Sequence, residues 1–249
     1  MTGGKTAGGE VTRMITTILW DVDGTLLDFG EAERRAMRRL FAEFGLGECT
    51  DEMLRRYAKI NVSFWERLER GELTRDQVLC GRFEQFFGEC GIDPRIIPEY
   101  NRQYQQRLGD TAIPRDDSVE LVRSLRARVR QYVVSNGTVA AQTRKLEKSG
   151  LRELMDGVFL SEKIGAEKPS RAFFKKVFDE IHPGDLSQVL IVGDSLTSDM
   201  QGGINAGIRT CWYDPEGKPL PEGYAVDLVI RDLRELPAYL DARQAREER

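Results

Sequence analysis

The stretch Ile18-Leu19-Trp20-Asp21-Val22-Asp23-Gly24-Thr25-Leu26-Leu27 (ILWDVDGTLL) places two acidic residues directly after an apolar run. The run has the composition of a buried strand. Unpaired carboxylates at the end of a core element cost free energy unless something compensates them. We therefore expect Asp21 and Asp23 to face a cation or to take part in chemistry.

The composition around this stretch is that of a globular chain. Among 249 residues, 40% are apolar and 31% are charged, and no apolar run approaches the ~20 residues of a membrane span. The 41 acidic residues slightly outnumber the 37 basic ones, which leaves no basic surplus for nucleic-acid binding. We expect no membrane partner and no nucleic-acid partner.

The cysteines and the N-terminus bear on location. The four cysteines lack the spacing of a zinc site or a disulfide framework, which favours reduced thiols in the cytoplasm. Residues 1–13 (MTGGKTAGGEVTR) have no apolar signal core and no helical period, so we predict a disordered leader, with Met14 as a candidate start.

From Ile15 onward, short apolar runs alternate with segments of helical period, which predicts βαβ units and a mostly parallel sheet. The fold class is α/β, a Rossmann-like parallel sheet flanked by helices. The predicted strands are Ile15–Trp20, Gln131–Val134, Val158–Leu160, Val189–Val192, Thr210–Tyr213 and Asp227–Ile230.

One long region breaks this alternation. Residues 29–111 show only helical patterns, separated by glycine and proline turns. We predict an inserted, all-helical cap domain at 29–111, a lid over the end of the first strand. Residues 14–28 and 112–249 would then form the core domain.

Polar residues follow several predicted strands, and in a parallel sheet the carboxyl ends of the strands meet at one edge. We therefore expect these side chains to converge. The set consists of Asp21, Asp23, Ser135, Asn136, Lys168 and Asp194.

The residue types match a single task. Asp21, Asp194 and Asp199 are the oxygen ligands that Mg²⁺ prefers. The serine hydroxyl, the lysine and the amides at the start of the helix after Asn136 can hold phosphoryl oxygens. A carboxylate, a metal and an anion cradle together indicate phosphoryl transfer through an aspartyl-phosphate.

Four ordered motifs resemble those of the haloacid dehalogenase-like (HAD) hydrolase superfamily, in its helical-cap phosphatase branch. They are Asp-Val-Asp-Gly-Thr-Leu from Asp21, Ser135 at a strand end, the pair Lys168-Pro169, and Gly193 to Asp199. The resemblance covers nearly all of the chain after the leader.

Carried over residue by residue, the resemblance implies a role for each motif. Asp21 would be the nucleophile, and Asp23 would protonate the leaving oxygen and then activate water. The implied catalytic residues are Asp21, Asp23, Ser135 and Lys168; those around phosphate are Ser135, Asn136, Gly137 and Lys168; those around Mg²⁺ are Asp21, Asp194 and Asp199, with Asp23 through its backbone carbonyl. An acid at position 23 is typical of the phosphatases and mutases, since the dehalogenase branch lacks it and the transport ATPases carry threonine there.

Within the helical region, Asn61 to Gly71 and Gly81 to Glu84 are similar to the bacterial YjjG/YfnB-type subgroup, which includes pyrimidine 5′-nucleotidases. This favours a small phosphorylated metabolite, a nucleoside 5′-monophosphate, as substrate. Trp65 could stack on a base and Arg82 could bind a polar edge or phosphate. Equally, Trp65 could fill the cap core and Arg82 could form an ion pair on a helix surface.

Other functions remain open at this point. A phosphatase of sugar phosphates or phosphoglycolate and a phosphohexomutase share the motifs. A receiver-type phospho-acceptor module, which is not an enzyme, also uses carboxylates, a hydroxyl and a lysine around Mg²⁺, but it needs neither Asp23 nor the helical insert. We expect a monomer or a homodimer.

Overall fold

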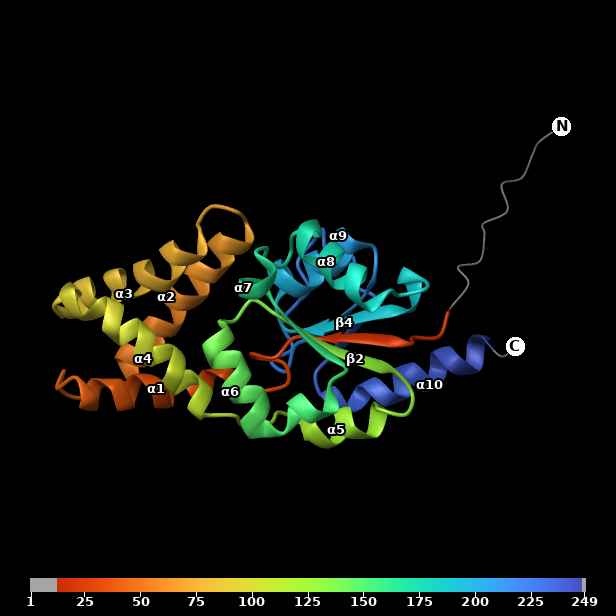
Figure 1. The fold of residues 1–249 in the computed structure, drawn as a ribbon, viewed down its shortest axis with the longest axis horizontal. Coiled ribbons are helices and arrows are strands. Elements are labelled where there is room, and N and C mark those ends of the chain that lie inside the picture. The colour runs from red at the N-terminus through yellow and green to blue at the C-terminus, as the bar shows by residue number, and fades with distance from the viewer. Residues whose placement is uncertain (1–12, 248–249) are drawn as a thin grey trace.

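The chain forms a parallel α/β sheet with helices on both faces and a group of four helices at one end (Figure 1). The computed structural model describes residues 13–247, so the predicted leader, apart from Arg13, lies outside the described residues. The strand order is β3-β2-β1-β4-β5-β6, and every neighbouring pair is parallel. The predicted fold class is confirmed.

All six predicted strands are present, with ends that differ by one or two residues. Strand β1 is buried along its whole length and lies between β2 and β4, with Trp20 in register with Val133 and Val192. Burial on both faces explains why the central strands β1, β2 and β4 read as continuous apolar runs. Their bounds are β1 Thr17–Trp20, β2 Arg130–Ser135, β3 Gly157–Leu160, β4 Val189–Gly193, β5 Arg209–Tyr213 and β6 Leu228–Ile230.

Two apolar cores sandwich the sheet. Helices α5, α6 and α10 pack on one face, and α8 and α9 pack on the other (Figure 1). The helix bounds are α1 Phe29–Glu43, α2 Asp51–Glu69, α3 Arg75–Cys90, α4 Ile97–Asp110, α5 Ser118–Leu125, α6 Val139–Ser149, α7 Ser161–Ile164, α8 Arg171–Ile181, α9 Gln201–Ala206 and α10 Leu236–Glu247.

Helices α1 to α4 enclose a third apolar core of their own, rich in aromatic rings. Tyr57 stacks on Phe83 at 5.2 Å between ring centroids, and Tyr104 meets Phe83 edge-on at 5.1 Å. The Thr50 and Thr74 side chains cap the amino ends of α2 and α3 and so fix where these two helices begin. The division into a cap domain and a core domain at the predicted boundaries stays a prediction.

The chain enters and leaves this four-helix group through two adjacent segments. Leu27 forms an antiparallel bridge with Pro114. The Asp28 N–H donates to the Ile113 carbonyl at 2.9 Å, and the Arg115 N–H donates to the Leu26 carbonyl at 3.0 Å. The two connections therefore run side by side next to the end of β1.

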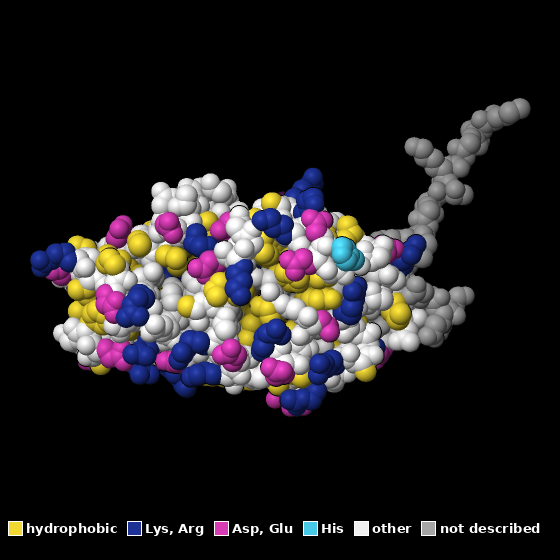
Figure 2. Space-filling model, in the orientation of Figure 1, with side chains coloured by type: hydrophobic (Ala, Val, Ile, Leu, Met, Phe, Trp, Pro, Cys, Tyr) yellow, Lys and Arg dark blue, Asp and Glu magenta, His cyan; other side chains and the backbone are white. Residues whose placement is uncertain are grey.

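On the face seen in Figure 2, acidic and basic side chains intermingle, which agrees with the nearly balanced composition. Over residues 13–247, no helix combines the length and the apolar character needed to cross a membrane.

Candidate active site

The candidate site lies at the carboxyl edge of the sheet, where β1, β2 and β4 end side by side. Asp21 follows β1, Ser135 is the last residue of β2, and Asp194 follows β4. The strand order reverses between β1 and β4, and this is the place where open parallel sheets bind ligands.

Three carboxylates meet at this edge. One ligand oxygen from each of Asp21, Asp194 and Asp199 lies within 4.8 Å of the others. Asp21 and Asp199 are buried, whereas Asp194 is exposed. Glycine permits this approach, because a Cβ at Gly24 would lie 2.4 Å from an Asp194 oxygen and one at Gly193 would lie 2.2 Å from the Asp199 carboxylate.

Lys168 is the cation among these acids, and its side chain is 1% exposed. Its ammonium donates to Asp21 Oδ1 at 2.8 Å, to Asp199 Oδ1 at 2.5 Å and to the Val134 carbonyl at 2.9 Å. Asn136 holds its backbone from both sides, since Oδ1 accepts from the Lys168 N–H and Nδ2 donates to the Lys168 carbonyl. Three acceptors and two backbone bonds thus fix the ammonium against Asp21.

Burial, together with the neighbouring charges, shifts the pKa values of several groups in this cluster. Burial raises the pKa of Asp21 well above its ordinary value, against the opposing effect of Lys168. Asp194 is exposed when the whole residue is considered, but the surrounding protein shields its carboxyl group from water. This desolvation, and then the Asp199 charge, raises the pKa of Asp194 to about 7. Burial alone would lower the pKa of Lys168, but Asp199 and Asp21 outweigh it and raise it.

This donor set suits a hard divalent cation. Three carboxyl groups face one ammonium, and burial, with a further contribution from neighbouring aspartates, raises the pKa values of Asp21 and Asp194. A divalent cation bound here would favour the ionised form of these groups. The Asp194 carboxylate also accepts from Thr25 Oγ1 at 3.1 Å, and the Asp199 carboxylate accepts from the Ser195 N–H at 3.2 Å. Such outer contacts are typical of metal ligands held in one orientation.

The predicted phosphate-binding segment lies beside this cluster. Ser135 is buried, and its Oγ accepts from the Gly137 N–H at 3.0 Å. Thr138 caps α6 by accepting from the Ala141 N–H. The Asn136 side chain is bonded to the Lys168 backbone, and the Val139 N–H at the start of α6 donates to Glu162 Oε2 at 2.5 Å.

The Asp23 side chain is not among the three clustered carboxylates. Its two oxygens accept instead from Gln142 Nε2, at 2.5 Å, and from the Lys145 ammonium, both on α6. These two donors were not predicted from the sequence, although their spacing of three residues places them on one helix face.

Comparison with known proteins agrees with this geometry. The family model described as haloacid dehalogenase-like hydrolase matches residues 15–207. The chain belongs to this family. It is therefore a hydrolase, and the resemblance seen in its motifs is confirmed.

Two relatives of this HAD-like hydrolase span almost the whole chain. The HAD-hydrolase YfnB of Bacillus subtilis is 36% identical over 222 residues, which cover 88% of this chain and 93% of YfnB. The pyrimidine 5′-nucleotidase YjjG of Escherichia coli is 30% identical over 223 residues, which cover 90% of this chain and 96% of YjjG. The crystal structure of YfnB bound to magnesium superimposes on this chain with a TM-score of 0.86 at 34% identity. The match covers 92% of this chain and 100% of the YfnB chain, and that structure is described as revealing interdomain movement.

The two predicted substrate-binding residues of the HAD-like hydrolase lie among α1 to α4. Trp65 is half-buried, and its indole N–H donates to Asn61 Oδ1 at 3.1 Å. Arg82 is only 1% exposed, donates to Asn61 at 2.8 Å and to Asn101 at 3.2 Å, and lies over the Tyr104 ring. The alternative of a surface ion pair for Arg82 is wrong, because the side chain is buried and its partners are amides. Its contact with substrate stays a prediction.

Contacts between the four-helix group and the loops of the site were not predicted. Arg75 donates to the Asn136 carbonyl at 3.0 Å and to Ser161 Oγ, and pairs with Glu167. At the end of α2, Glu69 accepts from Thr197 Oγ1, and burial raises the pKa of Glu69 to about 7. These two contacts hold the helices over the loops that carry Asn136 and Asp199.

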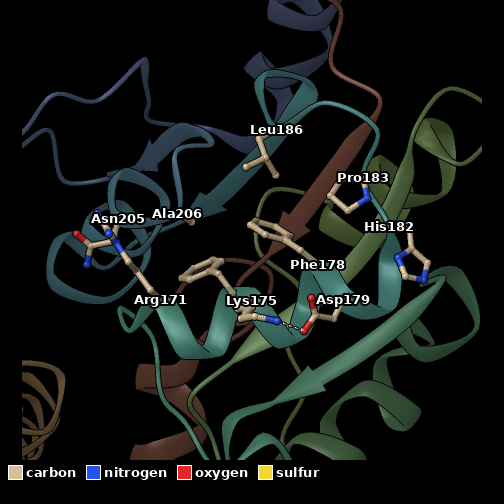
Figure 3. Close-up of a pocket in the computed structure, with 10 residues that line it drawn as sticks. Arg171, Lys175, Phe178, Asp179, His182, Pro183, Leu186, Asn205 and Ala206 are labelled. Atoms are coloured by element: carbon tan, nitrogen blue, oxygen red, sulfur yellow. Dashed lines mark hydrogen bonds and ion pairs between the residues drawn. The ribbon is translucent and has the colours of Figure 1, made fainter.

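Figure 3 shows a hollow elsewhere in the molecule, between α8 and the segment that ends α9. Phe178, His182, Leu186 and Asn205 are among its lining residues, and none of the predicted site residues lines it. The only histidine of the chain therefore lies apart from the carboxylates.

Proposed function

We propose that this HAD-family phosphatase hydrolyses nucleoside 5′-monophosphates, with Mg²⁺, through an aspartyl-phosphate on Asp21. The observation that carries the proposal is the cluster of Asp21, Asp194 and Asp199 around the Lys168 ammonium. A carboxylate nucleophile needs positive charge nearby to receive a phosphoryl group, and this cluster supplies both.

The reaction would proceed in two displacements at phosphorus. An Asp21 oxygen attacks, the bond from phosphorus to the ester oxygen breaks, and Asp23 gives that oxygen a proton so that the alcohol leaves. Asp23 then takes a proton from a water molecule, whose oxygen attacks the aspartyl-phosphate. The bond from phosphorus to Asp21 breaks, phosphate leaves, and both aspartates return to their starting states.

The remaining residues hold the phosphoryl group. Lys168, the Ser135 hydroxyl and the amides that begin α6 would bind its oxygens. Bound by Asp21, Asp194 and Asp199, together with the Asp23 carbonyl, Mg²⁺ would neutralise charge on the phosphoryl oxygens. The fit of the donor set and the magnesium-bound YfnB structure support this choice of ion.

Two relatives support a nucleotide as substrate. One is YjjG, and the other is the pyrimidine 5′-nucleotidase PynA of Streptococcus pneumoniae, which is 34% identical over 201 residues. A second candidate is a phosphorylated sugar acid, because the mouse N-acylneuraminate-9-phosphatase is 28% identical over 241 residues.

A steady-state panel of phosphate esters tests the proposal. We expect uridine and thymidine monophosphates to give the highest kcat/KM, above N-acylneuraminate 9-phosphate, phosphoglycolate and hexose phosphates. Activity should require Mg²⁺ and should disappear in Asp21→Asn, while the matched control Asp51→Asn, at an exposed acid on α2, stays active. Turnover in Asp21→Asn protein would refute the nucleophile, and a preference for a sugar phosphate would refute the substrate class.

A further inference from the structure

Asp23 is held by two side chains of α6 that no motif of the sequence includes. Gln142 Nε2 donates to Asp23 Oδ2 at 2.5 Å, and the Lys145 ammonium pairs with Oδ1. Each carboxylate oxygen thus has its own donor, and both donors come from one helix face. A carboxylate bound at both oxygens cannot rotate about its last side-chain bond without losing a hydrogen bond.

The surroundings of these donors show that the arrangement is enclosed. Gln142 is 0% exposed and Lys145 is 1% exposed, and the Lys145 ammonium lies 5.1 Å from the centre of the Phe29 ring. A buried ammonium is costly unless it is paired. Asp23 is the carboxylate with which Lys145 forms an ion pair in the described part of the chain, so the cost is offset at this position.

Gly137 adds an independent observation. A Cβ at this position would lie 2.2 Å from Gln142 Nε2 and 2.9 Å from Gln142 Cδ. Any side chain at 137 would therefore push the amide of Gln142 away from Asp23. The loop that presents amides to the phosphate site also leaves the space through which Gln142 reaches Asp23.

We propose that Gln142 and Lys145 are positioning residues that orient the Asp23 carboxyl group toward the leaving-group oxygen. The inference rests on the proposed function, in which Asp23 transfers a proton to that oxygen. The ion pair with Lys145 corresponds to the ionised form that Asp23 takes once the proton has left, so Lys145 would also stabilise the charge that forms on Asp23. Gln142 and Lys145 act through Asp23 and do not touch the phosphoryl group. Misplacement of a proton donor by about 1 Å costs on the order of 100-fold in rate.

Leaving-group dependence separates this role from a merely structural one. Phenoxide, with a conjugate-acid pKa of about 10, needs a proton as it departs, whereas p-nitrophenoxide is a far weaker base and departs without one. Loss of Asp23 orientation should therefore affect phenyl phosphate much more than p-nitrophenyl phosphate. A general loss of folded or active enzyme would reduce kcat/KM for both esters equally.

The experiment measures kcat/KM for both esters with excess MgCl₂. In Gln142→Leu and in Lys145→Met, we expect about a 100-fold loss with phenyl phosphate and less than about a tenfold loss with p-nitrophenyl phosphate. Asp23→Asn should show the same imbalance, and Lys145→Arg should restore most of the phenyl phosphate activity. Lys148→Met, at an exposed lysine on the same helix, is the matched control and should behave as wild type.

Gly137→Ala provides a second test in case either substitution prevents folding, because it displaces Gln142 without removing either donor. It should lower the ratio of phenyl to p-nitrophenyl phosphate activity in the same direction. Equal losses with both esters, or no loss, would overturn the inference. If wild-type protein hydrolyses the aryl esters but no nucleotide, only the substrate class fails; if it hydrolyses no phosphate ester, the proposed function and this inference fail together.

Discussion

Glu33 on α1 is an acid buried inside the four-helix group, and its replacement by glutamine should change how stability depends on pH. It is 5% exposed and accepts from Asn61 at 2.8 Å and from Tyr104 at 3.3 Å. Burial, only partly opposed by Arg82, raises the pKa of Glu33 from 4.5 to about 7. Between pH 4.5 and pH 7 the folded protein therefore holds a proton that the unfolded chain has lost, so stability falls as pH rises.

The size of the effect follows from the pKa shift. Each pKa unit corresponds to 1.36 kcal/mol, so Glu33 should cost the wild-type protein about 3 kcal/mol at pH 8 relative to pH 4. Glu33→Gln cannot ionise but keeps an acceptor oxygen for Asn61 or Tyr104. The free energy of unfolding of the variant minus that of wild type should therefore rise with pH by about this amount.

Urea unfolding of both proteins at a series of pH values, with a chelator present, measures this difference. The titration of the site carboxylates then cancels, because both proteins contain them. Glu31→Gln is the matched control on the same helix: hydrogen bonds from Arg35 and Arg34 lower the pKa of this partly exposed acid, so the difference should change in the opposite direction. A difference for Glu33→Gln that is flat between pH 4 and pH 8 would refute the reasoning.

Three further predictions concern the site and the contacts above it. Mg²⁺ at 100 times its dissociation constant should stabilise wild-type protein by about 2.7 kcal/mol in thermal unfolding, and Asp194→Asn should lose most of this gain; an equal gain in both would exclude Asp194 as a ligand. Gly193→Ala should displace the Asp199 carboxylate and so lower both the affinity for Mg²⁺ and the free energy of unfolding. Gly184→Ala, whose Cβ would have no atom within 4 Å, should change neither quantity, and unchanged Mg²⁺ affinity in Gly193→Ala would contradict the assignment of Asp199. Arg75→Met should cost about 2 kcal/mol of unfolding free energy, since it removes charged hydrogen bonds to the core loops. Arg67→Met, which removes a 3.4 Å ion pair with Glu72 from a side chain that is 40% exposed, should cost under about 0.5 kcal/mol; equal costs would show that the Arg75 contacts contribute no more than this ion pair.

Much of the fold could be predicted because its signals are local. The apolar runs around Trp20 and Val133 are buried on both faces, so consecutive apolar residues in them all indicate a buried strand. Asp21 and Asp194 could be placed together because parallel strands end at one edge, whatever lies between them in the chain. The long helical segment followed from its apolar period and its turns.

The partners of the site residues could not be predicted in the same way. The pairing of Asp23 with Lys145 joins a loop to a helix far along the chain, and the helical period indicates only which face of α6 is buried. Arg82 and Glu33 are charged residues inside an apolar core, and a periodicity argument assigns charged residues to solvent by default. Only packing in three dimensions shows which amides and rings surround them.

The paired connections at Leu27 and Pro114 have a consequence for how such a protein can diverge. Because the insert begins and ends at neighbouring points of the backbone, a different helical group could be spliced between them without changing the spacing of the sheet. Asp21, Asp23 and Lys168 all lie outside the spliced segment, so the proposed reaction centre would be inherited intact. Only the helical surface over the sheet edge would change. We expect a chimera that carries the α1 to α4 segment of a relative to take on that relative's substrate preference and to keep the same hydrolytic reaction.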